Sequence, residues 1–279
     1  MTKNISPIIQ PEELLKLNSE DYILIDASAG SKARYDDNHL AGALYIDLNT
    51  DLAEIKDFSF GGRHPLPPIE QFAETLGKFG IDSNSHVIIY DDKNGSNAAA
   101  RFWWMLKAVG HKKAQVLNGG FEAAIKVGFP SDSLKPEVAA KNPYPVISWQ
   151  LPLAYIDEVE LASKTGNQTI VDVRDAGRFD GLTEPIDLIA GHIPGAINIP
   201  FTGNLDENGL FLSPSILRDK YSEALADTKP ENVIVHCGSG VTACHMLLAM
   251  AYADLEIPKL YVGSWSEWSR NNKNMVLAK

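Results

Sequence analysis

The stretch Val233–Thr242, which reads VIVHCGSGVT, is followed by the apolar run Ala243–Tyr252. Three strand-favouring residues in a row, a glycine-containing turn and an apolar segment of helical length predict a β-strand that leads into an α-helix. In a parallel sheet covered by helices, ligands bind at the carboxyl ends of the strands. Cys237, the first residue of the turn, is therefore expected at the place where a reactive side chain would meet a ligand.

The same pattern occurs once earlier in the chain, where His86–Asp91 leads into the apolar stretch Ala98–Val109. Further pairs of motifs match in the same order, which is the signature of an internal repeat. They are Tyr22–Asp26 with Thr169–Asp172, His39–Ala43 with His192–Ala196, and Leu117–Phe121 with Tyr261–Trp265. Short β-branched runs that alternate with helical stretches predict that each copy is a doubly wound α/β domain with a parallel sheet.

The chain length of 279 residues is sufficient for two such domains. We expect an N-terminal domain over residues 1–129 and a C-terminal domain over residues 151–279. Residues 130–150 between them contain several prolines and no apolar period, so the sequence predicts a linker that runs over the surface.

Composition and charge narrow the function classes. The chain has 44% hydrophobic and 22% charged residues, which is typical of a soluble globular protein. No stretch approaches the ~18 apolar residues of a membrane span, and the first ten residues lack the apolar core of a signal peptide. A net charge of −11 without a Lys/Arg cluster argues against nucleic-acid or anionic-membrane partners. We therefore expect a cytoplasmic protein whose partners are small molecules and proteins.

The chain contains two cysteines, Cys237 and Cys244, in one short segment. Such a pair provides neither a disulfide framework nor a set of metal ligands. A cytosolic cysteine is more often a small buried hydrophobe than a nucleophile, and Cys244, inside the apolar helix, fits that description. Cys237 differs because the free N–H groups at a helix start stabilise a thiolate, and because Gly238 and Gly240 allow the backbone to curl around it.

The Cys237 loop and several other motifs resemble the tandem-domain rhodanese family, the mercaptopyruvate and thiosulfate sulfurtransferases. The other motifs are Asp172–Arg174 with Arg178–Phe179, Gly191–Ala196, Trp103–Trp104 and Leu117–Gly120. The resemblance covers almost the whole chain. It implies two rhodanese-like domains with one active site, because the first copy has Asp91 at the place of Cys237, and a carboxylate cannot hold sulfane sulfur.

The resemblance also implies a chemistry. The Cys237 thiolate would take sulfur from a small-molecule donor and hold it as a persulfide, which then passes its outer sulfur to a thioredoxin-like thiol or to cyanide in a ping-pong sequence. Gly238, Gly240, Val241 and Thr242 would complete the substrate-binding loop. No metal or organic cofactor is implied.

The resemblance leaves two candidate sulfur donors, mercaptopyruvate and thiosulfate. Thiosulfate enzymes of the family carry basic side chains directly after the cysteine, whereas the neutral loop here resembles the mercaptopyruvate branch. That branch uses a serine two residues after the cysteine, a histidine and an aspartate, which by position are Ser239, His64 and Asp47. Such a chain of groups could protonate the enolate that leaves as pyruvate. Taken alone, each of the three would be an ordinary loop or turn residue.

Arg178 is the residue that we expect to bind the substrate carboxylate, because a planar guanidinium can donate two parallel hydrogen bonds. The alternative is a surface ion pair with Asp180 or Glu184. Mercaptopyruvate enzymes usually have a second arginine where this chain has Asp187, and an acid there is closer to the thiosulfate branch. We expect this acid to repel the donor carboxylate, so that Asp187→Arg would lower the KM for mercaptopyruvate.

Two other function classes would keep the fold. A rhodanese-like cysteine phosphatase needs a longer loop that an arginine closes, whereas this loop continues into Ala243–His245. A non-catalytic sulfur-binding or interaction module would never form a persulfide.

Two histidines and two tryptophans have structural interpretations. His39 and His192 recur in both copies, including the copy that lacks the cysteine, so we expect them to order the fold and not to take part in catalysis. Trp265 and Trp268 are expected in the core or in a pocket wall.

Overall fold

The computed structural model describes residues 5–226 and 228–277. Its contacts divide into two compact units. The first unit holds the described residues up to Glu54, Pro67–Gln150 and Glu207–Phe211, and the second holds Ile55–Leu66, Leu151–Asp206 and the described residues from Leu212 onward. The segment Ile55–Leu66, with Arg63 and His64, therefore belongs to the same unit as Cys237.

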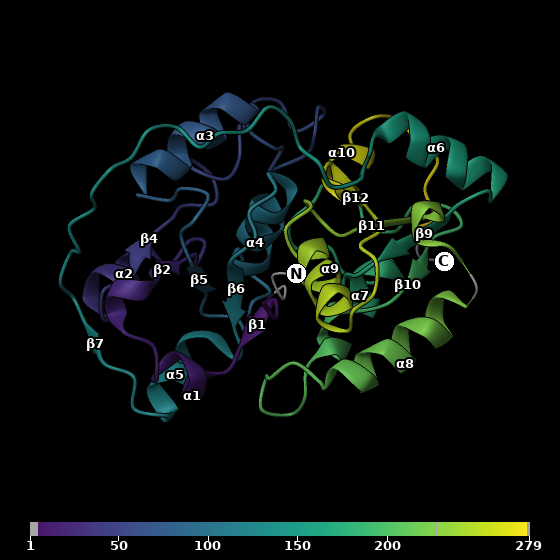
Figure 1. Cartoon of the computed structure of the whole chain (residues 1–279). Coiled ribbons are helices and arrows are strands. Elements are labelled where there is room, and N and C mark those ends of the chain that lie inside the picture. The colour runs from purple at the N-terminus through teal and green to yellow at the C-terminus, as the bar shows by residue number, and fades with distance from the viewer. Residues whose placement is uncertain (1–4, 227, 278–279) are drawn as a thin grey trace. The chain divides into compact units, whose positions relative to one another are not determined.

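A five-stranded parallel sheet forms the centre of the first unit, with the strand order β1-β6-β5-β2-β4 (Figure 1). Its strands are β1 (Ile8–Ile9), β2 (Ile23–Asp26), β4 (Leu44–Tyr45), β5 (Val87–Tyr90) and β6 (Ala114–Leu117). The helices are α1 (Pro11–Leu14), α2 (Lys32–Asp37), α3 (Ile69–Lys78), α4 (Ala99–Ala108) and α5 (Gly120–Lys126). In addition, β3 (His39–Leu40) pairs antiparallel with β7 (Ser131–Asp132).

The second unit repeats this topology with the strand order β8-β12-β11-β9-β10, again with every neighbouring pair parallel. The strands are β8 (Leu153–Ala154), β9 (Thr169–Asp172), β10 (Ile197–Asn198), β11 (Val233–His236) and β12 (Lys259–Tyr261). The helices are α6 (Ile156–Thr165), α7 (Ala176–Phe179), α8 (Pro214–Leu225), α9 (Ala243–Tyr252) and α10 (Ser264–Trp268). The match of the two orders, strand for strand, confirms the predicted duplication of a parallel α/β domain.

The central strands of both sheets are buried along their whole length. Val87–Tyr90 and Val233–His236 are nearly continuous apolar runs, as expected for strands that helices cover on both faces. Trp265 and Trp268 belong to the buried core of the second unit, where neither has exposed surface. Of the two places that the sequence allowed for these tryptophans, the structure shows the core.

His39 and His192 make the same contacts in their respective units. The His39 ring stacks on Tyr35 at a centroid distance of 4.0 Å, and its Nδ1 lies 2.6 Å from the Tyr35 carbonyl oxygen. The His192 ring stacks on Phe179 at 3.8 Å, and its Nδ1 lies 2.7 Å from the Phe179 carbonyl oxygen. Each histidine therefore ties a short helix to the loop that follows it, which agrees with a structural role.

The segment expected as a surface linker packs along the first unit. Its strand β7 pairs with β3, and the buried Tyr144 donates its backbone N–H to the Ala73 carbonyl oxygen at 2.9 Å. The Trp149 ring stacks on the Trp104 ring at a centroid distance of 6.3 Å. The prolines keep the segment extended, and its aromatic residues anchor it to the unit.

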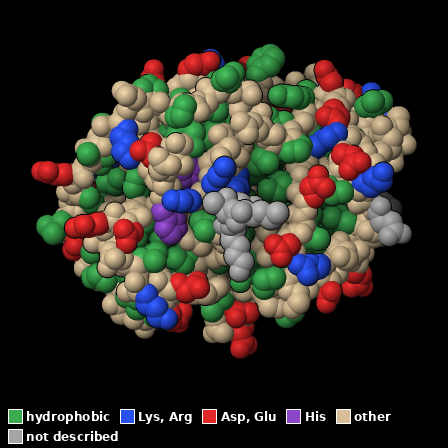
Figure 2. All heavy atoms as spheres, viewed as in Figure 1, with side chains coloured by type: hydrophobic (Ala, Val, Ile, Leu, Met, Phe, Trp, Pro, Cys, Tyr) green, Lys and Arg blue, Asp and Glu red, His purple; other side chains and the backbone are tan. Residues whose placement is uncertain are grey.

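Within residues 5–226 and 228–277, each helix is too short or too polar to cross a membrane. On the face drawn in Figure 2, acidic side chains are interspersed with lysines and arginines.

Candidate active site

Cys237 lies at the carboxyl end of β11, in the middle of the second sheet, and opens the loop Cys237–Thr242 that leads into α9. The residue is 2% exposed. Its backbone N–H donates to Ser264 Oγ at 3.2 Å, and its carbonyl oxygen accepts the Trp265 N–H at 3.0 Å. The start of α10 therefore fixes the backbone that carries the thiol.

The two loop glycines have different tasks. Gly240 has a φ of +73°, and a Cβ at this residue would lie 2.5 Å from the Val262 carbonyl oxygen, so the loop can close only around a glycine. At Gly238, a Cβ would lie 3.3 Å from a guanidinium nitrogen of Arg63 and 3.3 Å from one of Arg178. Gly238 therefore leaves room for two arginines beside Cys237.

A cavity of about 130 Å³ lies in front of Cys237. Its walls are formed by Arg63, Arg174, Asp175, Arg178, Ile186, Phe201, Cys237, Gly238, Ser239 and Thr242. Three guanidinium groups thus line the space beside the thiol, which favours an anionic substrate even though the chain has a net charge of −11. Of the expected binding residues, Arg178, Gly238 and Thr242 line this cavity, whereas Gly240 and Val241 shape the loop outside its lining.

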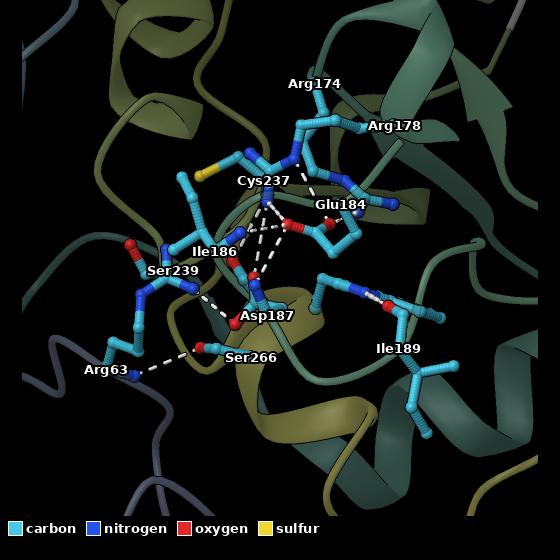
Figure 3. A network of polar contacts seen from close by, with 12 residues as sticks. Arg63, Arg174, Arg178, Glu184, Ile186, Asp187, Ile189, Cys237, Ser239 and Ser266 are labelled. Atoms are coloured by element: carbon cyan, nitrogen blue, oxygen red, sulfur yellow. Dashed lines mark hydrogen bonds and ion pairs between the residues drawn. The ribbon is translucent and has the colours of Figure 1, made fainter. Parts of the chain in front are cut away.

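A network of buried ion pairs holds these arginines (Figure 3). Arg174 donates from Nε and Nη2 to Asp172 at 2.6 to 3.1 Å. Arg178 donates from Nη2 and Nε to Glu184 at 2.8 and 3.2 Å. Burial acts to raise the pKa of both carboxyl groups. At Asp172 this effect is outweighed by His236 and Arg174, and at Glu184 it is outweighed chiefly by Arg178. The pKa values of both groups therefore lie below the usual range.

Asp187 lies inside the arginine network and outside the cavity lining. Its side chain has no exposed surface, and its carboxylate pairs with Arg63 and, at 3.3 Å, with Arg178 (Figure 3). It also pairs with Arg270 at 3.3 Å. The expectation that Asp187 repels the donor carboxylate is therefore wrong, because three guanidinium groups neutralise it. The effect of Asp187→Arg on the KM for a donor stays a prediction.

Arg63 is a cavity residue that sequence reasoning missed. It precedes His64 directly, and this adjacency was the one available signal. Only the fold shows that Ile55–Leu66 is part of the second unit and brings both side chains to the Cys237 loop.

Ser239 and His64 meet as expected. Nδ1 of His64 lies 2.8 Å from Oγ of Ser239, which lines the cavity two residues after Cys237. The backbone N–H of Arg63 donates to Ser266 Oγ at 3.0 Å, and this contact anchors the loop that carries His64. A hydroxyl that is paired with an imidazole beside a nucleophile can transfer a proton.

Asp47 caps a turn of the first unit. Its Oδ1 accepts the backbone N–H groups of Asn49 at 2.8 Å and Thr50 at 3.0 Å, and its own N–H donates to Asp51 Oδ2 at 2.8 Å. These are the contacts of a turn residue, which the sequence had left open as an alternative. Participation of Asp47 in proton transfer stays a prediction.

Cys244 is completely buried in α9, and its Sγ donates to the Gly240 carbonyl oxygen at 3.4 Å. This is the packing position expected for it. Within the described parts of the chain, no group of three or more His, Cys, Asp or Glu side chains is placed to hold a metal ion.

Comparisons with known proteins show what the whole chain is similar to. The model of the rhodanese-like domain matches residues 10–126 and 156–271. The probable 3-mercaptopyruvate sulfurtransferase of Pseudomonas aeruginosa is 38% identical over 91% of this chain and 89% of its own length. The thiosulfate sulfurtransferase of Gallus gallus is 35% identical over 85% of this chain and 81% of its own length. The solved structure of 3-mercaptopyruvate sulfurtransferase from Leishmania major has a TM-score of 0.84 at 28% identity, and the match covers 97% of this chain and 76% of that one.

Proposed function

The chain belongs to the rhodanese family and is a sulfurtransferase, and we propose that it takes sulfur from 3-mercaptopyruvate and carries it as a persulfide on Cys237. The observation that carries the proposal is the 2.8 Å contact between His64 and Ser239 at the cavity that Cys237 lines. A donor that leaves as an enolate needs a proton, and this pair is placed to supply one.

In the first half-reaction the Cys237 thiolate attacks the sulfur of mercaptopyruvate. The new S–S bond forms while the bond between that sulfur and the donor carbon breaks, and its electron pair goes to the carbon to give the enolate of pyruvate. The Ser239 hydroxyl gives its proton to the enolate, and His64 restores the proton to Ser239. Arg178, which lines the cavity next to Gly238, holds the carboxylate.

In the second half-reaction a nucleophilic acceptor attacks the outer sulfur of the persulfide. The S–S bond breaks, the Cys237 thiolate is released, and the acceptor leaves with the sulfur, so the reaction is ping-pong. A thioredoxin-like thiol of the cytoplasm is the proposed acceptor, and cyanide would serve in an assay. Ile186, which is 56% exposed and lines the cavity, marks a side from which an acceptor can approach.

Thiosulfate is the second candidate donor. The three guanidinium groups of the cavity suit a dianion, and a thiosulfate sulfurtransferase is among the relatives. Sulfite, however, leaves thiosulfate as a stable anion, so the contact between His64 and Ser239 would have no chemical task with that donor.

The two donors are separated by steady-state kinetics. We expect a kcat/KM at least about tenfold higher with mercaptopyruvate than with thiosulfate. In Ser239→Ala and in His64→Ala, kcat with mercaptopyruvate should fall roughly 10²-fold, while kcat with thiosulfate changes much less. Equal losses with both donors would show that the pair organises the Cys237 loop and does not deliver a proton.

We also keep Asp47 as a proposed third member of the proton relay. Asp47→Asn preserves one turn-capping oxygen and removes the charge. It should lower kcat with mercaptopyruvate and leave kcat with thiosulfate unchanged, whereas a residue that only caps its turn would change the melting temperature alone.

A further inference from the structure

Three large aliphatic side chains are exposed within one loop of the second unit. They are Leu182, Ile186 and Leu188, with exposed fractions of 73%, 56% and 70%. The loop follows α7, and we call it the 182–188 loop. Single exposed aliphatic residues are common on protein surfaces, whereas three of them in so short a segment form a cluster that a partner can cover.

The two carboxylates of the 182–188 loop face inward. The side chains of Glu184 and Asp187 are 3% and 0% exposed, and both pair with Arg178, at 2.8 and 3.3 Å (Figure 3). The backbone N–H groups of Ile186 and Asp187 donate to Glu184 Oε1 at 3.1 and 3.0 Å. These contacts account for the buried carboxylates of the loop, but not for the aliphatic side chains that it exposes.

The first unit is shorter at this place. In the first unit, His39 Nδ1 contacts the carbonyl oxygen of Tyr35, four positions before it. The equivalent contact of His192 in the second unit is with Phe179, thirteen positions before it. The second unit therefore has nine more residues here, and the 182–188 loop lies among them. Because both units share the same sheet order, we attribute the longer segment to a task of the second unit and not to the fold.

The 182–188 loop lies beside the cavity in which the second half-reaction would take place. Ile186 lines this cavity together with Cys237. The cavity holds about 130 Å³, and Cys237 is 2% exposed, so an acceptor sulfur must be carried in on a narrow group. A cysteine on a protruding segment of a folded protein meets this requirement. The surface around such a cysteine would then lie against the residues beside the cavity.

We propose that the 182–188 loop is the docking surface for a protein acceptor whose reduced cysteine lies on a protruding segment among apolar residues. The inference rests on the persulfide of the proposed function and adds the surface that selects a protein thiol over a small one. Burial of the three aliphatic side chains against the partner favours the complex. In that complex the partner thiolate attacks the outer sulfur of the persulfide, the S–S bond breaks, and the Cys237 thiolate is released.

Acceptor kinetics separate docking from chemistry. With reduced thioredoxin as the protein-thiol probe, Leu188→Ser should raise the KM for this acceptor roughly tenfold. The KM values for dithiothreitol and for cyanide should change less than about twofold, because Leu188 does not line the cavity and small acceptors need not cover the loop. Leu161→Ser is the matched control, since Leu161 is 54% exposed on α6 of the same unit, and it should leave all three values unchanged. An equal rise with dithiothreitol would overturn the inference.

A binding measurement needs no sulfur donor and therefore keeps this inference apart from the proposed function. Reduced thioredoxin, labelled for NMR, is titrated with the Cys237→Ser protein, with and without Leu188→Ser, after thermal melts confirm that each variant is folded. Binding that weakens roughly tenfold in the double variant supports the inference even if wild type takes no sulfur from mercaptopyruvate. Undetectable binding to the Cys237→Ser protein, or equal binding to both proteins, would contradict it.

A second copy of the chain is the other occupant that would cover the 182–188 loop. Sedimentation velocity of wild type and of Leu188→Ser, over the same range of concentrations, tests for it. We expect the same distribution of species in both proteins, because the loop is kept for a different partner. A dimer that forms in wild type and is lost in Leu188→Ser would assign the loop to self-association and refute the proposal.

Discussion

Arg34 and Arg178 occupy the same point in the two units and have different tasks. Each precedes the aromatic residue that stacks on the following histidine. Arg34 donates its Nη2 to the buried Asp26 at 2.6 Å and to Ser28 Oγ at 2.7 Å, and it is therefore committed to holding the first sheet together. Arg178 instead pairs with Glu184 and Asp187, and it lines the cavity in front of Cys237.

The residue two positions after the buried aspartate of each sheet accounts for the different tasks of Arg34 and Arg178. Asp26 pairs in register with Tyr90, and Asp172 pairs in the same way with His236, so the two buried aspartates are equivalent. Two residues later the first unit has Ser28, and the second has Arg174, which grips Asp172 with two nitrogens. Because Arg174 satisfies this acid, the arginine of the short helix is available for a ligand.

The loops that follow β5 and β11 also differ, because one is filled by its own side chain and the other is open to a ligand. Asp91 is fully buried, and its two oxygens accept four backbone N–H groups of its own loop at 2.8 to 3.1 Å. Cys237 stands at the equivalent place at the head of an open cavity. The first unit fills the anion position with its own carboxylate, and the second leaves room for a substrate.

The largest expected effect comes from removing the Cys237 thiol of the second unit. Cys237→Ser should lower sulfur transfer more than about 10³-fold with either donor, because the other thiol, Cys244, is completely buried and does not line the cavity. Cys244→Ser is the matched control at the second residue of α9, and it should keep more than about half of the activity. A loss of similar size in both variants would mean that the activity depends on the packing of this region and not on Cys237 as a nucleophile.

A smaller effect follows from giving the second unit the residue of the first. In Arg174→Ser, Arg178 should turn back to the unsatisfied Asp172, as Arg34 does to Asp26, and KM for mercaptopyruvate should rise about 10²-fold. Steady-state kinetics measure the rise, and a thermal melt checks the fold, since loss of one partner of a buried pair is destabilising. The reverse change, Ser28→Arg, should leave KM unaltered. An unchanged KM in Arg174→Ser would refute the comparison.

The smallest expected effect concerns the loop of the first unit that the Asp91 carboxylate fills. Asp91→Asn replaces one of the two accepting oxygens by an NH₂ group, which faces two of the four N–H groups in either orientation of the amide. We expect the free energy of unfolding to fall by roughly 2 kcal/mol, with little change in kcat/KM. Denaturant unfolding and a donor assay on the same preparation measure both. Lost activity at unchanged stability would assign Asp91 a catalytic task.

The elements, and the place of Cys237 at the end of a central strand, could be predicted because their signals are local. The apolar runs Val87–Tyr90 and Val233–His236 are strands, and the repeated motifs fix the duplication. The role of Asp187 could not be predicted, because its partners come from other segments and only the packing of Ile55–Leu66 on the second unit neutralises it. The same packing conceals Arg63 from any local pattern.

Intact-mass spectrometry tests most directly the claim that one unit of this duplicated fold carries sulfur. The protein is treated with mercaptopyruvate without an acceptor, and the labelled peptide is then mapped. We predict one added sulfur atom on the wild type, located on Cys237, the same addition on Cys244→Ser, and none on Cys237→Ser. Sulfur on Cys244, or an addition that survives in Cys237→Ser, would contradict the account.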